Sequence, residues 1–127
     1  MDYASLPGLE VSWEGLDCCA VVTLRGEVDL DTAPLLESHI EVLTRRSTEH
    51  LLFDCVQLTF IDSSGIHVLT RAHQAVNGSL GLVGLQAPVQ RLFEIVGLTD
   101  EFPAFSSVGE ARKYIHNGGK ARFSSGA

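Results

Sequence analysis

The chain has 127 residues, of which 45% are hydrophobic and 20% are charged. This length and composition fit one folded domain, and they exclude both a disordered chain and a catalytic domain joined to a separate regulatory domain. The 9 basic and 16 acidic residues give a net charge of −7, which disfavours binding to nucleic acids or to anionic membranes.

The first half of the chain predicts a β-hairpin, a helix and a buried strand. Residues 9–13 alternate between apolar and polar side chains, as in a half-buried strand, and the apolar run 18–24 follows after a short turn. Asp31 is a candidate helix cap, and apolar residues recur at helical spacing from there to two arginines at 45–46. The continuous apolar run 51–56 predicts a central strand that is covered on both faces.

The second half alternates between helical and strand-like segments. Helices are expected at 66–76, 88–96 and 107–116, and strands at 80–85 and 102–105. Alternating strands and helices predict an α/β fold, with a mixed or mainly parallel sheet of about five strands and about four helices packed against it. We expect an N-terminal extension at 1–8, one domain at 9–116 and a flexible, Gly- and Ser-rich C-terminal tail at 117–127.

A short polar motif, residues 62–65 (DSSG), stands between an apolar strand and a helix. The first turn of a helix has unpaired N–H groups and the positive end of the helix dipole, so a phosphate on Ser63 would be favourably placed. Helical spacing puts Ser63 on one polar stripe with His67 and Arg71, and we expect this stripe to face water. The alternative is that Asp62 and Ser63 act only as helix caps, which is the usual role of these residue types.

Three segments together resemble the signature segments of the STAS domain family. They are residues 60–66 (FIDSSGI), 26–29 (GEVD) followed by Thr32 and Ala33, and 89–98 (VQRLFEIVGL). They occur in the family's order and at similar spacing, so the resemblance covers residues 9–115. Within the family the chain is most similar to bacterial anti-sigma factor antagonists, and the resemblance implies the STAS fold.

The resemblance also implies a cycle of partner switching. The unphosphorylated antagonist binds an anti-sigma factor that is also a serine kinase, and this binding releases a sigma factor. The kinase then phosphorylates the serine that follows the aspartate, and a PP2C-type phosphatase removes the phosphate. By this resemblance Ser63 is the phosphate acceptor, Ser64 is a less favoured one, and Asp29 lies beside the acceptor. The implied partner-binding residues are Asp29, Thr32, Asp62, Ser64, Gly65, Ile66 and His67.

His67 departs from the family's pattern, which usually has a small residue, often glycine, at this position. A larger and titratable group there could change which kinase docks. Another role within the same family also stays open, either as a scaffold subunit of a stressosome-like complex or as an accessory subunit of a membrane-transport complex.

An enzymatic role has little support in the sequence. A serine hydrolase of the Gly-x-Ser-x-Gly type needs a glycine two residues before the nucleophile, whereas Ile61 precedes Ser63 by two. The five histidines show no metal-binding spacing, so we expect no catalytic residue, no metal and no cofactor. We expect a cytoplasmic protein, because no membrane-spanning run or signal peptide is visible, and either a monomer or a weak homodimer.

Overall fold

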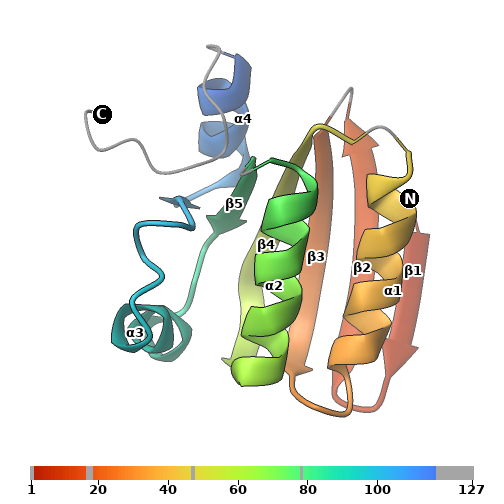
Figure 1. The fold of residues 1–127 in the computed structure, drawn as a ribbon, viewed down its shortest axis with the longest axis vertical. Helices are drawn as coiled ribbons and strands as arrows, with labels where there is room; N and C mark the ends of the chain where they lie inside the picture. The colour runs from red at the N-terminus through yellow and green to blue at the C-terminus, as the bar shows by residue number, and fades with distance from the viewer. Residues whose placement is uncertain (1, 17–18, 47, 78, 117–127) are drawn as a thin grey trace.

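The computed structural model describes residues 2–16, 19–46, 48–77 and 79–116. In chain order the elements are β1 (Asp2–Leu6), β2 (Leu9–Leu16), β3 (Cys19–Val28), α1 (Ala33–Thr44), β4 (His50–Ile61), α2 (Ser63–Ala75), β5 (Leu80–Val83), α3 (Ala87–Ile95), β6 (Ala104–Phe105) and α4 (Val108–His116), as Figure 1 shows. The expected flexible tail at 117–127 lies outside the described residues.

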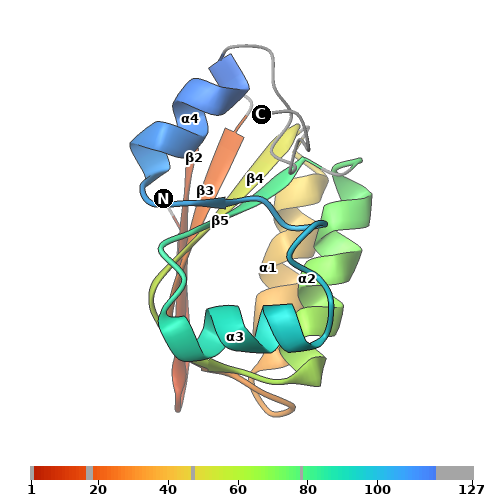
Figure 2. The same cartoon turned by 90° about the vertical axis from the view of Figure 1, so that its left-hand side faces the viewer.

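The strands form one six-stranded sheet in the order β1-β2-β3-β4-β5-β6. β1, β2 and β3 pair antiparallel, whereas β3, β4, β5 and β6 pair parallel. Helices α1 and α2 cover one face of the sheet, and α4 lies on the opposite face near one end (Figure 2). The α/β class, the mainly parallel sheet, the hairpin of β2 and β3 and the four helices are confirmed.

The sheet has one strand more than the sequence predicts. β1 lies within residues 1–8, where the sequence predicts an extension before the domain, and it pairs with β2 from Asp2↔Trp13 to Leu6↔Leu9. Its sequence, DYASL, is short and does not alternate between polar and apolar residues, so it gives no strand pattern. The strand therefore depends on its partner β2, which it reaches through a tight turn at Gly8, where φ is +94°.

The central strand β4 is buried on both faces, as its apolar run predicts. Leu51 and Phe53 face α1 and α2, while Leu52 faces the smaller cluster around Ala111 of α4. The Cys55 side chain is fully buried in the larger cluster, and this burial raises the pKa of its thiol to about 12. This thiol is therefore protonated at neutral pH and packs as a small apolar group.

β3 and β4 continue further than their apolar runs indicate, as far as the pair Val28↔Ile61. The register shifts twice along this pairing, and the second shift lies between Gly26 and Glu27. At Gly26 φ is +113°, and a Cβ atom there would lie 2.2 Å from the carbonyl oxygen of Gly8. Only glycine allows this close approach of the β1–β2 turn to β3.

We predict that Gly26→Ala lowers the free energy of unfolding by about 2–4 kcal/mol, because it combines backbone strain with a clash against backbone atoms. Urea denaturation followed by circular dichroism measures this change. Gly15→Ala is the matched control, since a Cβ there meets nothing within 4 Å. Equal stability of the two variants would contradict the assigned role of Gly26.

Candidate functional site

Asp62 connects the end of β4 to the start of α2. Its backbone is extended, and its side-chain Oδ1 accepts hydrogen bonds from the backbone N–H groups of Ser64, at 2.9 Å, and Gly65, at 3.3 Å. This cap lets α2 begin at Ser63, three residues before the expected start at Ile66. Two of the backbone donors that the sequence predicts to be open to a phosphate are therefore occupied by Asp62.

A second carboxylate orders the loop between β3 and α1. Asp29 Oδ1 accepts hydrogen bonds from the backbone N–H groups of Asp31 and Thr32, both at 3.0 Å. The Thr32 hydroxyl donates to the carbonyl oxygen of Glu27 at 2.9 Å and accepts from the Asp29 N–H at 2.9 Å. The N-cap of α1 is the buried Thr32, within the segment 31–34 where the sequence predicts the helix to begin.

The ends of β3 and β4 hold these two loops together. The Asp62 N–H donates to the carbonyl oxygen of Val28 at 3.1 Å. A Cβ on Gly65 would lie 2.5 Å from Ile61 Cγ1 and 2.8 Å from Val28 Cγ1, so the first turn of α2 packs directly on both strand ends. The position of Ser63 is therefore fixed by the sheet beneath it.

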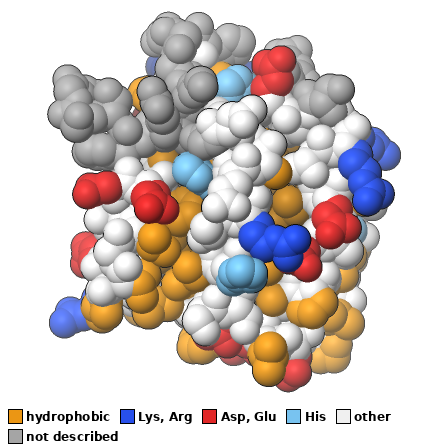
Figure 3. Space-filling view, in the orientation of Figure 1, with side chains coloured by type: hydrophobic (Ala, Val, Ile, Leu, Met, Phe, Trp, Pro, Cys, Tyr) orange, Lys and Arg blue, Asp and Glu red, His pale blue; other side chains and the backbone are white. Residues whose placement is uncertain are grey.

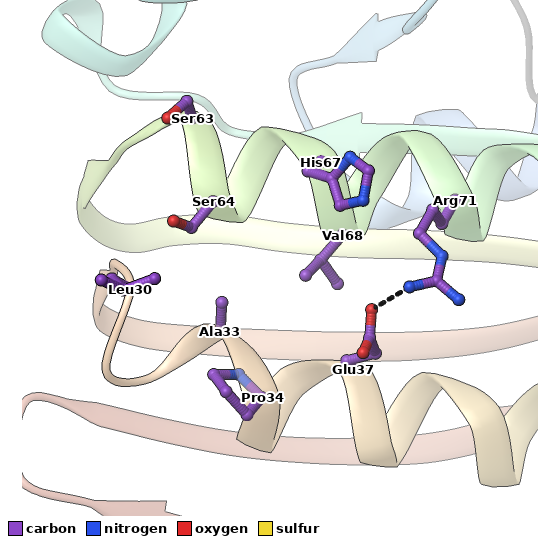
Figure 4. Close-up of a pocket in the computed structure, with 9 residues that line it drawn as sticks. All are labelled: Leu30, Ala33, Pro34, Glu37, Ser63, Ser64, His67, Val68 and Arg71. Atoms are coloured by element: carbon purple, nitrogen blue, oxygen red, sulfur yellow. Dashed lines mark hydrogen bonds and ion pairs between the residues drawn. The ribbon is translucent and has the colours of Figure 1, made fainter.

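A groove of about 490 Å³ runs between α1 and α2 beside this junction. Figure 4 shows the residues that line it: Leu30, Ala33, Pro34, Glu37, Ser63, Ser64, His67, Val68 and Arg71. Leu30 is 74% exposed at its mouth. At the other end Arg71 of α2 forms an ion pair with Glu37 of α1 at 2.9 Å. Leu30, Ala33, Pro34 and Val68 form an apolar part of the groove, and the other residues of its lining carry polar side chains along α2 and at Glu37. Such a mixed surface suits contact with a protein better than chemistry on a small molecule.

The structure places the predicted site residues in two environments. Ser63 and His67 are exposed and Ser64 is half-buried, and all three line the groove. Thr32 and Gly65 are buried, so they act on the site through the loops that they hold. The half-buried Ile66 and the two aspartates complete the set around the start of α2. The side of α2 opposite Ser63 is buried as expected except at its last residue, Ala75.

Sequence reasoning did not identify the α1 side of the groove. Ala33, Pro34 and Glu37 line the same groove as Ser63 only because α1 and α2 pack side by side on the sheet. The one local sign of this part of the groove in the sequence is Leu30, an apolar residue between two aspartates in a loop. Figure 3 shows hydrophobic side chains exposed on the lower part of this face, where α3 and the first turns of α1 and α2 lie.

The described residues contain no group of three or more His, Cys, Asp or Glu side chains that could hold a metal ion. Within the same part of the chain, every helix is too short or too polar to cross a membrane.

Comparison with known proteins finds a family model, sequence relatives and similar solved structures. The family model described as the STAS domain matches residues 10–111. The chain is 28% identical to an anti-sigma F factor antagonist of Paenibacillus polymyxa, over 78% of this chain and 88% of that protein. It is 33% identical to an anti-sigma-B factor antagonist of Listeria monocytogenes, over 62% of this chain and 72% of that protein. The crystal structure of an anti-sigma factor antagonist from Mycobacterium paratuberculosis superposes with a TM-score of 0.78 at 25% identity, covering 89% of this chain and 98% of that one.

We predict that Asp62→Ala lowers the free energy of unfolding by about 1 kcal/mol, because α2 loses its N-terminal cap. Asp62→Asn keeps a side-chain oxygen that can accept the same two hydrogen bonds, so it should recover most of the loss. Thermal and urea unfolding of the three proteins tests this. Asp31→Ala, at an exposed position, is the control and should change stability by less than about 0.5 kcal/mol. An equal loss in the Asn and Ala variants would show that Asp62 does not act as a cap.

Proposed function

This chain belongs to the STAS domain family, and we propose that it acts there as an anti-sigma factor antagonist. It binds an anti-sigma factor that has serine-kinase activity, and this releases a sigma factor. Phosphorylation of Ser63 ends the interaction, and a PP2C-type phosphatase restores the active form. The names of its relatives, an anti-sigma F and an anti-sigma-B factor antagonist, support a regulatory role in the cytoplasm rather than an enzymatic one.

The position of Ser63 is the observation that carries this proposal. Ser63 is exposed, it is the first residue of α2, and it stands at the rim of the groove. A kinase can therefore reach its hydroxyl without unfolding any part of the domain. Ser64 is half-buried and lies on the side of α2 nearer to α1 (Figure 4). This difference in access favours Ser63 over Ser64 as the acceptor.

The surroundings of Ser63 explain how one phosphate can switch partner binding. A phosphoserine carries nearly two negative charges at neutral pH. A partner that packs on Leu30 and on the rest of the apolar part of the groove would have to cover this charge next to the carboxylate of Asp62. Burying an unpaired charge costs several kcal/mol, which corresponds to a loss of about a hundredfold or more in affinity.

The surface that we propose for the partner extends beyond the residues named from the sequence. It comprises the mouth of the groove, with Leu30, Pro34, Ser63, Ser64 and His67. Thr32 and Gly65 support this surface from below, because both are buried. The net charge of −7 favours a partner with basic residues around its contact region.

We predict that incubation with the cognate anti-sigma kinase and ATP places a single phosphate on Ser63. Intact-mass measurement should show one added phosphate on the wild-type chain and on Ser64→Ala, and none on Ser63→Ala. Fragmentation mass spectrometry then locates the modified residue. Phosphate incorporation into Ser63→Ala would refute the assignment. Loss of incorporation in Ser64→Ala but not in Ser63→Ala would refute it as well.

We predict that Ser63→Glu weakens binding to the anti-sigma factor at least tenfold, whereas Ser63→Ala changes the affinity by less than about threefold. Glutamate brings charge and bulk to the rim of the groove, while alanine removes only a small hydroxyl. Calorimetric titration of both variants in one buffer provides the comparison. Equal affinities of the two variants would exclude a switch that works by charge and size.

A further inference from the structure

A phosphate on Ser63, which the proposed function requires, would meet a helix end at which two backbone donors are already engaged. The backbone N–H groups of Ser64 and Gly65 already donate to Asp62 Oδ1. The phosphate would thus lie beside the carboxylate of Asp62, which already accepts the hydrogen bonds of these two N–H groups. A positive counter-charge from the protein would then come from a side chain.

His67 is the side chain placed to supply this charge. Ser63 and His67 both belong to α2 and are both exposed, and they are four residues apart. On a helix this spacing separates the Cβ atoms by about 5–6 Å, and an anion four residues before a cation is the favourable order. Figure 4 shows both residues on the wall of the groove that α2 provides, with the His67 ring turned toward Arg71, so a rotation of this exposed side chain has to bring the ring to the phosphate.

The other charged groups around the groove are already engaged or lie further away. Among the described residues that line it, only His67 and Arg71 can be positively charged. Arg71 is eight residues from Ser63, about 12 Å along the helix axis, and it is paired with Glu37 of α1. On the loop between β3 and α1, Asp29 Oδ1 is bonded to two backbone N–H groups, and the exposed Asp31 adds negative charge.

We propose that the protonated His67 imidazole pairs with the phosphate of phosphorylated Ser63 and makes the phosphorylated state sensitive to pH. The pair needs a charged imidazole, which is favoured at lower pH, and a doubly charged phosphate, which is favoured at higher pH. Histidine changes charge between about pH 5 and 8, and phosphoserine loses its second proton near pH 6. Because one of the two charges is lost as the pH rises and the other as it falls, the pairing is strongest at an intermediate pH.

The test uses phosphoserine incorporated at position 63 during translation, so that it does not depend on any kinase. The ³¹P chemical shift of this phosphate is followed from about pH 4.5 to 8.5 in the phosphoprotein with His67 and in its His67→Gln variant. Loss of the imidazole should raise the midpoint of the phosphate titration by about 0.2–0.4 pH unit, because the doubly charged form loses a partner.

Two further variants separate pairing from a general effect of substitution. His67→Lys keeps a positive charge, so its midpoint should be at or below that of the His67 protein. His39→Gln is the matched control, because His39 lies on α1 outside the groove, and it should leave the midpoint unchanged. Equal midpoints in the His67 protein and its His67→Gln variant, or an equal shift in His39→Gln, would overturn the proposal.

The outcomes for this pairing and for the proposed function are distinguishable. If the anti-sigma kinase leaves Ser63 unmodified, the proposed function fails, while the titration still decides whether His67 pairs with a phosphate at this position. If Ser63 is phosphorylated and the midpoints coincide, the switch stands and His67 has no part in it.

Discussion

The parallel pairing of β3 with β4 is the constraint on which the site depends. It continues through two register shifts to Val28↔Ile61, so both strands end at the same level. The loops that leave these ends, with Asp29 on one and Asp62 on the other, are therefore neighbours. The hydrogen bond from the Asp62 N–H to the Val28 carbonyl oxygen extends the pairing by one step, up to the residue before Ser63. A shorter ladder would leave the start of α2 without support.

The carboxylates of Asp29 and Asp62 accept hydrogen bonds from the backbone N–H groups of the turns that follow them. Asp62 holds the first turn of α2, and Asp29 holds the turn that leads into α1. Ser63 is left as an exposed hydroxyl on a rigid base, at the rim of a groove that is only partly apolar. Such a surface changes little in shape when a phosphate is added, and it changes greatly in charge. A modification of Ser63 would therefore change the charge of this surface without any movement of the fold.

The sequence predicts those parts of the fold that carry a strong local pattern. The continuous apolar run of β4 and the polar motif at the start of α2 are both recognisable. β1 is not, because its five residues become a strand only by pairing with β2. The sequence pattern places the start of α2 too late, since that start depends on where the Asp62 side chain points. The groove is also beyond local reasoning, because Leu30 and Pro34 line it together with Ser63 only through the packing of two helices.

One oxygen atom links the N-terminal hairpin to the loop beside the site. The Gly8 carbonyl accepts the Glu27 N–H at 2.8 Å and occupies the place that a Cβ on residue 26 would need. The consequence is evolutionary. A substitution at residue 26 is acceptable only after the β1–β2 turn has moved, and a change in that turn removes a support of the loop that carries Asp29. The two segments are therefore expected to diverge together, so that the β1–β2 turn limits how quickly the loop that carries Asp29 can change.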